Sequence, residues 1–278
     1  MSFHHSPATF VEEVAINVTN LERAKNFYVT ILGFSVLTKD KNEVQLTADG
    51  KTSLLKLIEP EGVQPRQPRT TGLYHFAILL PSRADLASII EHLAAHDIQL
   101  GASDHLVSEA LYFNDPDGNG IEVYRDRAKE EWNWHNQEVK MTVDPLDFEE
   151  VMAVPHDAWI KLPEETKMGH IHLHVSDLSE AEDFYGKLGF EAVCRYGQQA
   201  LFISTEGYHH HIGLNIWNGA GAPAPSEKAA GLVQYTLVFP NEETLLQAAE
   251  KTGAAQVAGG WFIKDPSQNG IFLKTASE

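Results

Sequence analysis

The chain repeats itself, and this constrains its fold more than any other feature of the sequence. The stretch VAINVTNLERAKNFYVTILGF at residues 14–34 matches IHLHVSDLSEAEDFYGKLGF at residues 171–190. Each copy predicts an alternating strand, a polar turn and a helix, because Asn20 or Asp177 suits a helix N-cap and the glycine near the end of each copy suits a helix C-terminus. A repeat on this scale predicts a fold assembled from copies of one supersecondary unit.

Two further stretches pair in the same way, so the unit occurs four times. TGLYHFAILLPSRADLASIIEHL at residues 71–93 matches AGLVQYTLVFPNEETLLQAAEKT at residues 230–252. The strand-rich ends of these two units also match, as YFNDPDGNGIEVY at residues 112–124 and WFIKDPSQNGIFL at residues 261–273. We therefore predict four units, each with a strand, a helix and further strands.

The length of 278 residues is sufficient for two domains, each holding two of these units. The predicted first domain covers residues 1–128 and the predicted second domain covers residues 166–278. Residues 129–165 are charged and contain three prolines, so they predict a partly helical linker. We expect the first residues, including His4 and His5, to form a flexible tail.

Composition excludes several classes of function. The net charge of −18 argues against a nucleic-acid partner, because phosphate binding needs basic patches. The single cysteine, Cys194, permits no internal disulfide and suits a reducing cytoplasm. No stretch approaches the roughly 18 apolar residues of a membrane span, and the N-terminal sequence predicts no signal peptide. Fourteen histidines favour a metal or acid–base site.

The repeated motif and the four-unit layout resemble a known superfamily. LERAKNFYVTILGF at residues 21–34 is typical of the vicinal oxygen chelate superfamily, which includes glyoxalases, bleomycin resistance proteins and extradiol dioxygenases. The resemblance covers nearly all of the chain outside the tail and the linker. It implies an α+β fold with two domains, in which paired βαβββ units form open mixed-sheet barrels around a metal.

In that superfamily a metal ligand comes from the first strand of a unit or from its last strand. Aligning the repeats identifies the first-strand positions of units one to four as Glu13, His75, His170 and Gln234. The last-strand positions that align are Glu122 in unit two, Gly213 in unit three and Phe272 in unit four.

The way in which the units pair decides which of these residues can form a site. Pairing within each domain would give the first domain Glu13, His75 and Glu122. It would give the second domain His170, Gln234 and Phe272, a set that cannot hold iron. Pairing across the domains brings His170 to His75 and Glu122. Two histidines and one carboxylate with open positions form the facial triad of non-haem Fe(II) oxygenases. The resemblance thus implies a metal site of His75, Glu122 and His170 that holds Fe(II), and Mn(II) would suit the same ligands.

Each of these residues also has a plainer interpretation. A lone histidine in an apolar strand, such as His75, is more often a hydrogen-bonded core residue. Glu122 could face solvent on an edge strand, and His170, His172 and His174 share one strand face that could be exposed. Three potential ligands at three repeat-aligned positions favour the metal site, because an unpaired buried carboxylate is costly.

The stretch HLVSEALYFNDPDGNGIEVY at residues 105–124 resembles the extradiol dioxygenase motif. The residues that match the motif are His105, Leu111, Tyr112, Asp115, Pro116, Gly118 and Glu122. Ser103 departs from it, because the family usually has glycine, asparagine, threonine or an aliphatic residue there. The resemblance implies that Tyr112 hydrogen-bonds an oxygen of the substrate or product, with His105 beside it.

A second marker is YHHHIGLN at residues 208–215. Extradiol enzymes carry a histidine pair at this point, and the second member acts as an acid–base group. The alignment identifies this member as His211, two residues before Gly213 and on the same face of the expected strand. The alternative is that the three consecutive histidines form a solvated loop.

The resemblance implies an enzyme, an extradiol (meta) ring-cleaving dioxygenase of the catechol 2,3-dioxygenase type. It would insert O2 into a catechol-type aromatic diol at a non-haem Fe(II) centre, as in the catabolism of aromatic hydrocarbons. The sequence leaves open whether the chain forms a homo-oligomer. One alternative is a glyoxalase-like isomerase, which would need zinc or nickel and a fourth carboxylate where this chain has Gly213. The other is a non-catalytic protein that binds small molecules and confers resistance.

Overall fold

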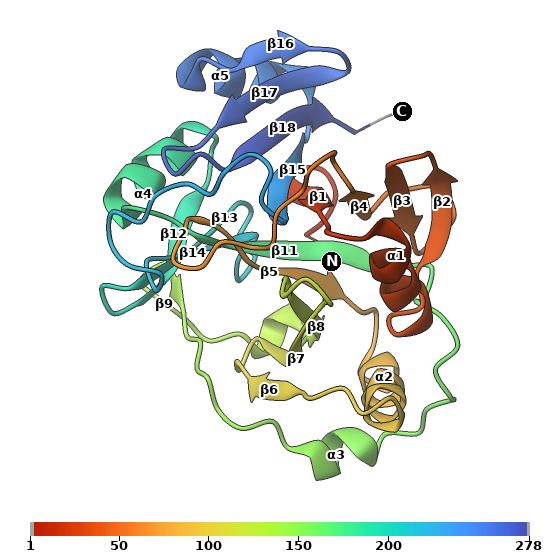
Figure 1. Ribbon diagram of the computed structural model, residues 1–278. Coiled ribbons are helices and arrows are strands. Elements are labelled where there is room, and N and C mark those ends of the chain that lie inside the picture. The colour runs from red at the N-terminus through yellow and green to blue at the C-terminus, as the bar shows by residue number, and fades with distance from the viewer. Residues whose placement is uncertain (1–2, 277–278) are drawn as a thin grey trace.

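The computed structural model describes residues 3–276 and consists of two eight-stranded mixed sheets. The main helices lie around the outside of the sheets (Figure 1). A single apolar cluster runs through all four units, with Val14, Phe76, Leu173 and Leu237 among its buried members. The mixed α+β architecture predicted from the sequence is confirmed.

The first sheet combines the first and fourth units, in the strand order β16–β17–β18–β15–β1–β4–β3–β2. The strands of the first unit are β1 (Phe10–Asn17), β2 (Ser35–Lys39), β3 (Glu43–Thr47) and β4 (Leu55–Ile58). Those of the fourth unit are β15 (Gly231–Phe239), β16 (Ala255–Val257), β17 (Gly260–Lys264) and β18 (Gly270–Thr275). The two units meet through the antiparallel pair of β1 and β15.

The second sheet combines the second and third units, in the strand order β12–β13–β14–β11–β5–β8–β7–β6. The strands of the second unit are β5 (Gly72–Leu79), β6 (Gly101–Asp104), β7 (Ser108–Asn114) and β8 (Gly120–Asp126). Those of the third unit are β11 (Lys167–His174), β12 (Glu191–Tyr196), β13 (Ala200–Ser204) and β14 (Ile212–Asn215). Here β5 and β11 form the antiparallel pair that joins the units.

One helix belongs to each unit, and each begins at a polar N-cap. The four helices are α1 (Leu21–Thr30), α2 (Arg83–Ala95), α4 (Leu178–Lys187) and α5 (Glu242–Thr252). The side chains of Asn20 and Asp177 accept backbone N–H groups of the first helical turn, as predicted. Gly33 and Gly189 follow α1 and α4 with φ values of 81° and 92°, which a glycine adopts without strain.

The helices α1 and α4 tie consecutive units together by the same contact. Tyr28 in α1 donates its hydroxyl hydrogen to Asp115 over 2.8 Å, and Tyr185 in α4 donates to Asp265 over 3.0 Å. All four side chains are buried. Each aspartate lies in the Asp-Pro turn before the last strand of the next unit, which belongs to the other sheet. The helix motif and the turn motif are therefore partners that fix consecutive units against each other.

The segment between the second and third units contains short elements. They are the 3-10 helix η1 (Lys129–Glu131), β9 (Trp134–His135), β10 (Glu138–Val139) and α3 (Phe148–Met152). The division into two domains with a linker at residues 129–165 stays a prediction. Each sheet combines one unit from before this segment with one unit from after it. Within residues 3–276, no helix has the length and apolar character that crossing a membrane requires.

The start of the chain is folded onto the second sheet, so the expectation of a flexible tail from His4 onward is wrong. His4 is only 6% exposed, and its Nε2 atom lies 2.7 Å from the carbonyl oxygen of Gly169. The ring of Phe3 stacks on that of Tyr208, with centroids 5.0 Å apart. This contact spans most of the chain length, so no local pattern in the sequence signals it.

Candidate metal centre

Three neighbouring strands of the second sheet bring His75, Glu122 and His170 together. In the antiparallel pair of β5 and β11, His170 lies opposite Ala77, and β8 runs parallel to β5 with Glu122 opposite the same Ala77. The ligand atoms of the three residues all lie within 4.8 Å of one another. The structure therefore brings together the set that the sequence predicted from pairing across the domains.

The two imidazoles converge on one carboxylate oxygen. His75 Nε2 lies 2.9 Å from Glu122 Oε2, and His170 Nε2 lies 3.0 Å from the same atom. All three residues are buried, with exposed fractions of 6% for His75, 3% for Glu122 and 1% for His170. Glu122 therefore does not face solvent, and the buried contact of His75 is with the carboxylate of the same predicted set.

Burial and charge set the protonation states of this cluster. Burial opposes ionisation of Glu122, but the charges and hydrogen bonds of His170 and His75 outweigh it and hold the pKa of Glu122 well below its usual value. Burial also lowers the pKa of His170. An ionised carboxylate and a neutral imidazole are the forms that bind a metal. Two nitrogens and one carboxylate oxygen that leave other positions open suit Fe(II) or Mn(II).

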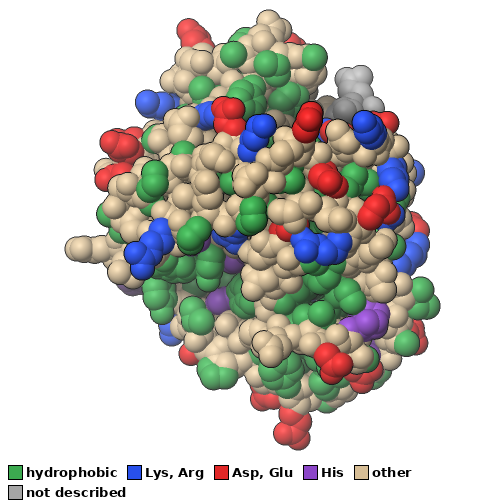
Figure 2. Space-filling view, viewed as in Figure 1, with side chains coloured by type: hydrophobic (Ala, Val, Ile, Leu, Met, Phe, Trp, Pro, Cys, Tyr) green, Lys and Arg blue, Asp and Glu red, His purple; other side chains and the backbone are tan. Residues whose placement is uncertain are grey.

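The cluster opens into a cavity of about 250 Å³. Much of its lining is apolar or aromatic, and these residues include Tyr74, Met141, Tyr196, Phe202 and Trp217. Figure 2 shows histidine side chains in a hollow bordered by hydrophobic side chains on the face in view. Such a cavity, with a few polar groups that converge on one point, is typical of a small-molecule site.

Tyr112 and His105 line the same cavity and form a hydrogen-bonded pair. His105 Nδ1 lies 2.6 Å from the carbonyl oxygen of Thr142, and His105 Nε2 lies 2.5 Å from Tyr112 Oη. A carbonyl oxygen can only accept, so His105 donates from Nδ1 to Thr142. Burial, followed by the charge of Glu122, raises the pKa of Tyr112 well above its usual value, which keeps the phenol protonated.

His211 does not reach the cavity, so its predicted placement is wrong. Its Nε2 atom lies 3.0 Å from the carbonyl oxygen of Phe3, and its Nδ1 atom lies 3.1 Å from Ser204 Oγ. His210 lines the cavity instead, and its ring centroid is 4.1 Å from that of His170. The prediction extended the strand alternation back from Gly213, but β14 begins only at residue 212 and a bend precedes it.

His172 is a second cavity residue that the sequence analysis did not identify as a site residue. It lies opposite His75 in the pair of β5 and β11, and its buried Nε2 has no hydrogen-bond partner among the described residues. A Cβ atom at Gly213 would lie 2.8 Å from His172 Cγ, so the glycine leaves room for this ring. The ring therefore occupies the space where a glyoxalase-like site would need its fourth carboxylate.

Gly169 provides a test of how tightly the strand behind the centre is packed. A Cβ atom there would lie 2.0 Å from Tyr124 Oη and 2.6 Å from the ring. We expect Gly169→Ala to lower the free energy of unfolding by about 1–3 kcal/mol or more, as overpacked cores do. Urea denaturation measures this change. Gly186→Ala is the control, because a Cβ atom at that position in α4 meets open space. Its free energy of unfolding should rise by about 1 kcal/mol, because alanine favours a helix more than glycine does. Equal stability of Gly169→Ala and the wild type would contradict this packing.

Solved structures share the overall architecture. Glyoxalase I from Zea mays has a TM-score of 0.60 at 15% identity, over 96% of this chain and 92% of that chain. A proposed dioxygenase from Bacillus subtilis has a TM-score of 0.66 at 13% identity, over 98% of this chain and 86% of that chain. Identities this low show the fold alone.

Sequence comparison adds closer relatives. Catechol-2,3-dioxygenase of Bacillus subtilis (strain 168) is 45% identical over 268 residues, which cover 93% of this chain and 94% of that protein. Biphenyl-2,3-diol 1,2-dioxygenase 2 of Rhodococcus globerulus is 28% identical over 41% of this chain and 60% of that protein. Residues 11–123 match the Glyoxalase/Bleomycin resistance protein/Dioxygenase superfamily. The chain belongs to this superfamily, also known as the vicinal oxygen chelate superfamily, as the resemblance implied.

Proposed function

We propose that the protein is an extradiol ring-cleaving dioxygenase that inserts O2 into a catechol-type aromatic diol. The observation that carries the proposal is the convergence of two buried imidazoles and one carboxylate at the floor of an apolar cavity. The 45% identical relative from Bacillus subtilis, which is named for catechol 2,3-cleavage, supports the choice of reaction. The substrates would be a small aromatic diol and O2.

His75, Glu122 and His170 would hold the metal, Fe(II) in our proposal, with Mn(II) as an ion that the same donors accept. When bound, the ion would supply a Lewis acid that lowers the pKa of a coordinated hydroxyl group and open positions for the diol and O2. Glu122 is the one anionic donor in this set. Neutral His170 with its hydrogen on Nδ1 would offer its Nε2 lone pair to the metal.

Other cavity residues would bind the substrate and handle protons. The hydroxyl oxygen of Tyr112, which is hydrogen-bonded to His105, would accept a hydrogen bond from the substrate. His210 would take a proton from a substrate hydroxyl and return it later in the reaction. Such acid–base groups typically contribute about 10² to 10⁴ in rate. The apolar lining would seat the aromatic ring and exclude water.

The reducing cytoplasm is the compartment that we propose. Cys194, the one cysteine of the chain, is a buried free thiol that lines the cavity. A free thiol persists in a compartment that keeps cysteines reduced. A place in the catabolism of aromatic compounds follows from the proposed reaction.

Activity after controlled loading tests the proposed function. The protein is treated with a chelator, loaded anaerobically with Fe(II) and mixed with catechol in air-saturated buffer. We expect a yellow ring-opened semialdehyde and the uptake of one O2 per catechol consumed, and no product from the metal-free control. A panel of substituted catechols and hydroquinones is then used. The absence of a ring-opened product from every member of the panel would contradict the proposed function.

A further inference from the structure

A chain of hydrogen bonds leads from the metal cavity into the protein behind His210. His209 Nδ1 lies 2.8 Å from His210 Nδ1, and His209 Nε2 lies 2.7 Å from Asp126 Oδ1. His209 is fully buried, and Asp126 stands at the end of β8, four residues beyond Glu122. Asp126, His209 and His210 therefore form a connected row whose last member faces the proposed substrate.

The directions of these hydrogen bonds follow from which atoms can donate. A carboxylate only accepts, so His209 carries a hydrogen on Nε2 and donates it to Asp126. In the neutral form of His209, Nδ1 then carries a lone pair. The two Nδ1 atoms at 2.8 Å share one hydrogen, which must come from His210. Neutral His210 is left with a bare Nε2.

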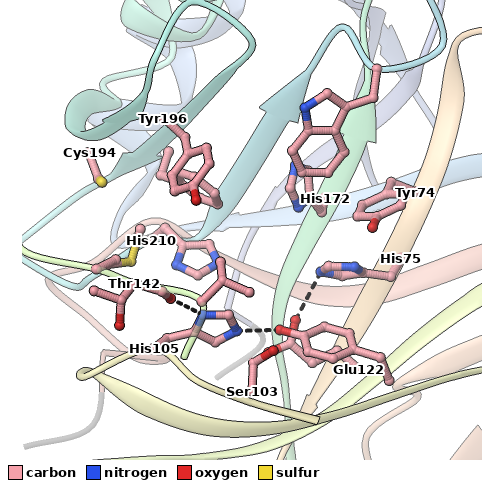
Figure 3. Close-up of a pocket in the computed structure, with 15 residues that line it drawn as sticks. Tyr74, His75, Ser103, His105, Glu122, Thr142, His172, Cys194, Tyr196 and His210 are labelled. Atoms are coloured by element: carbon pink, nitrogen blue, oxygen red, sulfur yellow. Dashed lines mark hydrogen bonds and ion pairs between the residues drawn. The ribbon is translucent and has the colours of Figure 1, made fainter. Parts of the chain in front are cut away.

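The surroundings of His210 agree with this assignment. Among residues 3–276, no hydrogen bond engages His210 Nε2, and the residue lines the cavity. Figure 3 shows the His210 ring next to that of His105, across the cavity from His75.

We propose that Asp126 and His209 are positioning residues that fix the tautomer of His210, so that its Nε2 atom meets the substrate as a proton acceptor. The inference rests on the proposed function of the cavity. The arrangement follows the logic of a serine protease triad, in which a buried aspartate sets the tautomer of the catalytic histidine. Here a second imidazole stands between the carboxylate and the acid–base group.

The side chain of Asp126, at the other end of the row from His210, has further contacts. Tyr208 donates its hydroxyl hydrogen to Asp126 over 3.3 Å, and the hydroxyl oxygens of Tyr208 and Tyr124 lie 2.8 Å apart. The side chain of Asp126 is 22% exposed and borders a separate small cavity with His4 and Trp132. Asp126 is thus held by Tyr208 and His209 on one side and reaches the surface away from the metal cavity.

Nitrogen NMR of histidine measures the tautomer without reference to activity. The full chain is labelled with ¹⁵N-histidine and loaded with Zn(II), a diamagnetic ion, and the His210→Asn spectrum assigns the His210 signals. We expect a protonated Nδ1 and a bare Nε2 in the wild type. In Asp126→Asn the amide can donate to His209 Nε2, so His209 carries its hydrogen on Nδ1 and donates it to His210 Nδ1. The hydrogen of His210 then moves to Nε2. A wild type with the proton on His210 Nε2, or no change in Asp126→Asn, would overturn the inference.

Steady-state kinetics of the Fe(II)-loaded variants provide a second test of the inference. Asp126→Asn is expected to lower kcat about 10²-fold, within the range of a lost acid–base group, with KM and iron content close to wild type. Asp126→Glu should recover part of kcat because it restores an acceptor. Tyr208→Phe is the matched control, since it removes the other contact of Asp126 and leaves the bond to His209. An equal loss of kcat in Tyr208→Phe and Asp126→Asn would also overturn the inference.

The two tests separate this inference from the proposed function. A wild type that cleaves no catechol would contradict the proposed function, while the NMR result would still decide how the His210 tautomer is set. An active wild type with the opposite tautomer would overturn the inference alone.

Discussion

Replacing Glu122 with glutamine is expected to abolish tight metal binding and, with it, ring cleavage. Glutamine keeps the size of the side chain but removes the one negative charge that faces His75 and His170. Residues that only support a ligand typically change metal affinity by about 10–100-fold, so loss of the anionic ligand itself should exceed about 10²-fold. Iron retained per chain after dialysis, together with the initial rate of semialdehyde formation, measures the effect.

The first sheet offers a matched control for this substitution. Glu13 occupies in β1 the position that His170 occupies in β11, and it is partly buried. Burial raises the pKa of Glu13 and so favours its neutral form, which glutamine resembles. Glu13→Gln should therefore retain iron and activity. Wild-type iron affinity in Glu122→Gln, or an equal loss in Glu13→Gln, would show that the carboxylate of Glu122 is not the ligand.

Replacing His210 with asparagine is expected to lower kcat by about 10² to 10⁴, the usual contribution of an acid–base group. The metal ligands remain, so the iron content should stay at the wild-type level. The physical reason is position, because His210 lines the cavity beside His170. Steady-state kinetics with catechol and an iron assay on the same sample measure both quantities.

The neighbouring histidine is the control for that result. His211 is fully buried and faces Phe3 and Ser204, so His211→Asn should keep kcat near the wild-type value. It should instead cost about 1–3 kcal/mol of folding stability, because buried polar partners lose their hydrogen bonds. If His211→Asn loses kcat and His210→Asn does not, the acid–base group is His211 and our assignment to the cavity residue is wrong.

The repeat is the reason that so much of the metal cluster could be predicted. The resemblance to the superfamily implied which strand positions carry ligands, and aligning the repeats located these positions at His75, His170 and Glu122. The same alignment gave Gln234 and Phe272 at the equivalent points of the fourth unit, which lie in the first sheet. Pairing the second and third units collects two histidines and one carboxylate, and this is the pairing that the second sheet shows.

The parts that the sequence could not supply depend on irregular backbone and on long-range contacts. Strand alternation favoured His211, but alternation holds only inside a strand, and the bend before β14 turns His210 toward the cavity. His172 could have been found, because it shares a strand face with His170 and needs the space beside Gly213. The docking of His4 onto Gly169 joins distant parts of the chain, and no spacing in the sequence encodes it.

The most direct test of the account is the location of the metal itself. Crystals of the Fe(II)-loaded protein are measured on both sides of the iron absorption edge, and the difference gives the anomalous density of iron. The account predicts one strong peak within bonding distance of His75 Nε2, His170 Nε2 and a carboxylate oxygen of Glu122. A peak elsewhere, such as beside Glu13 and Gln234 in the first sheet, or no peak in iron-loaded crystals, would contradict it.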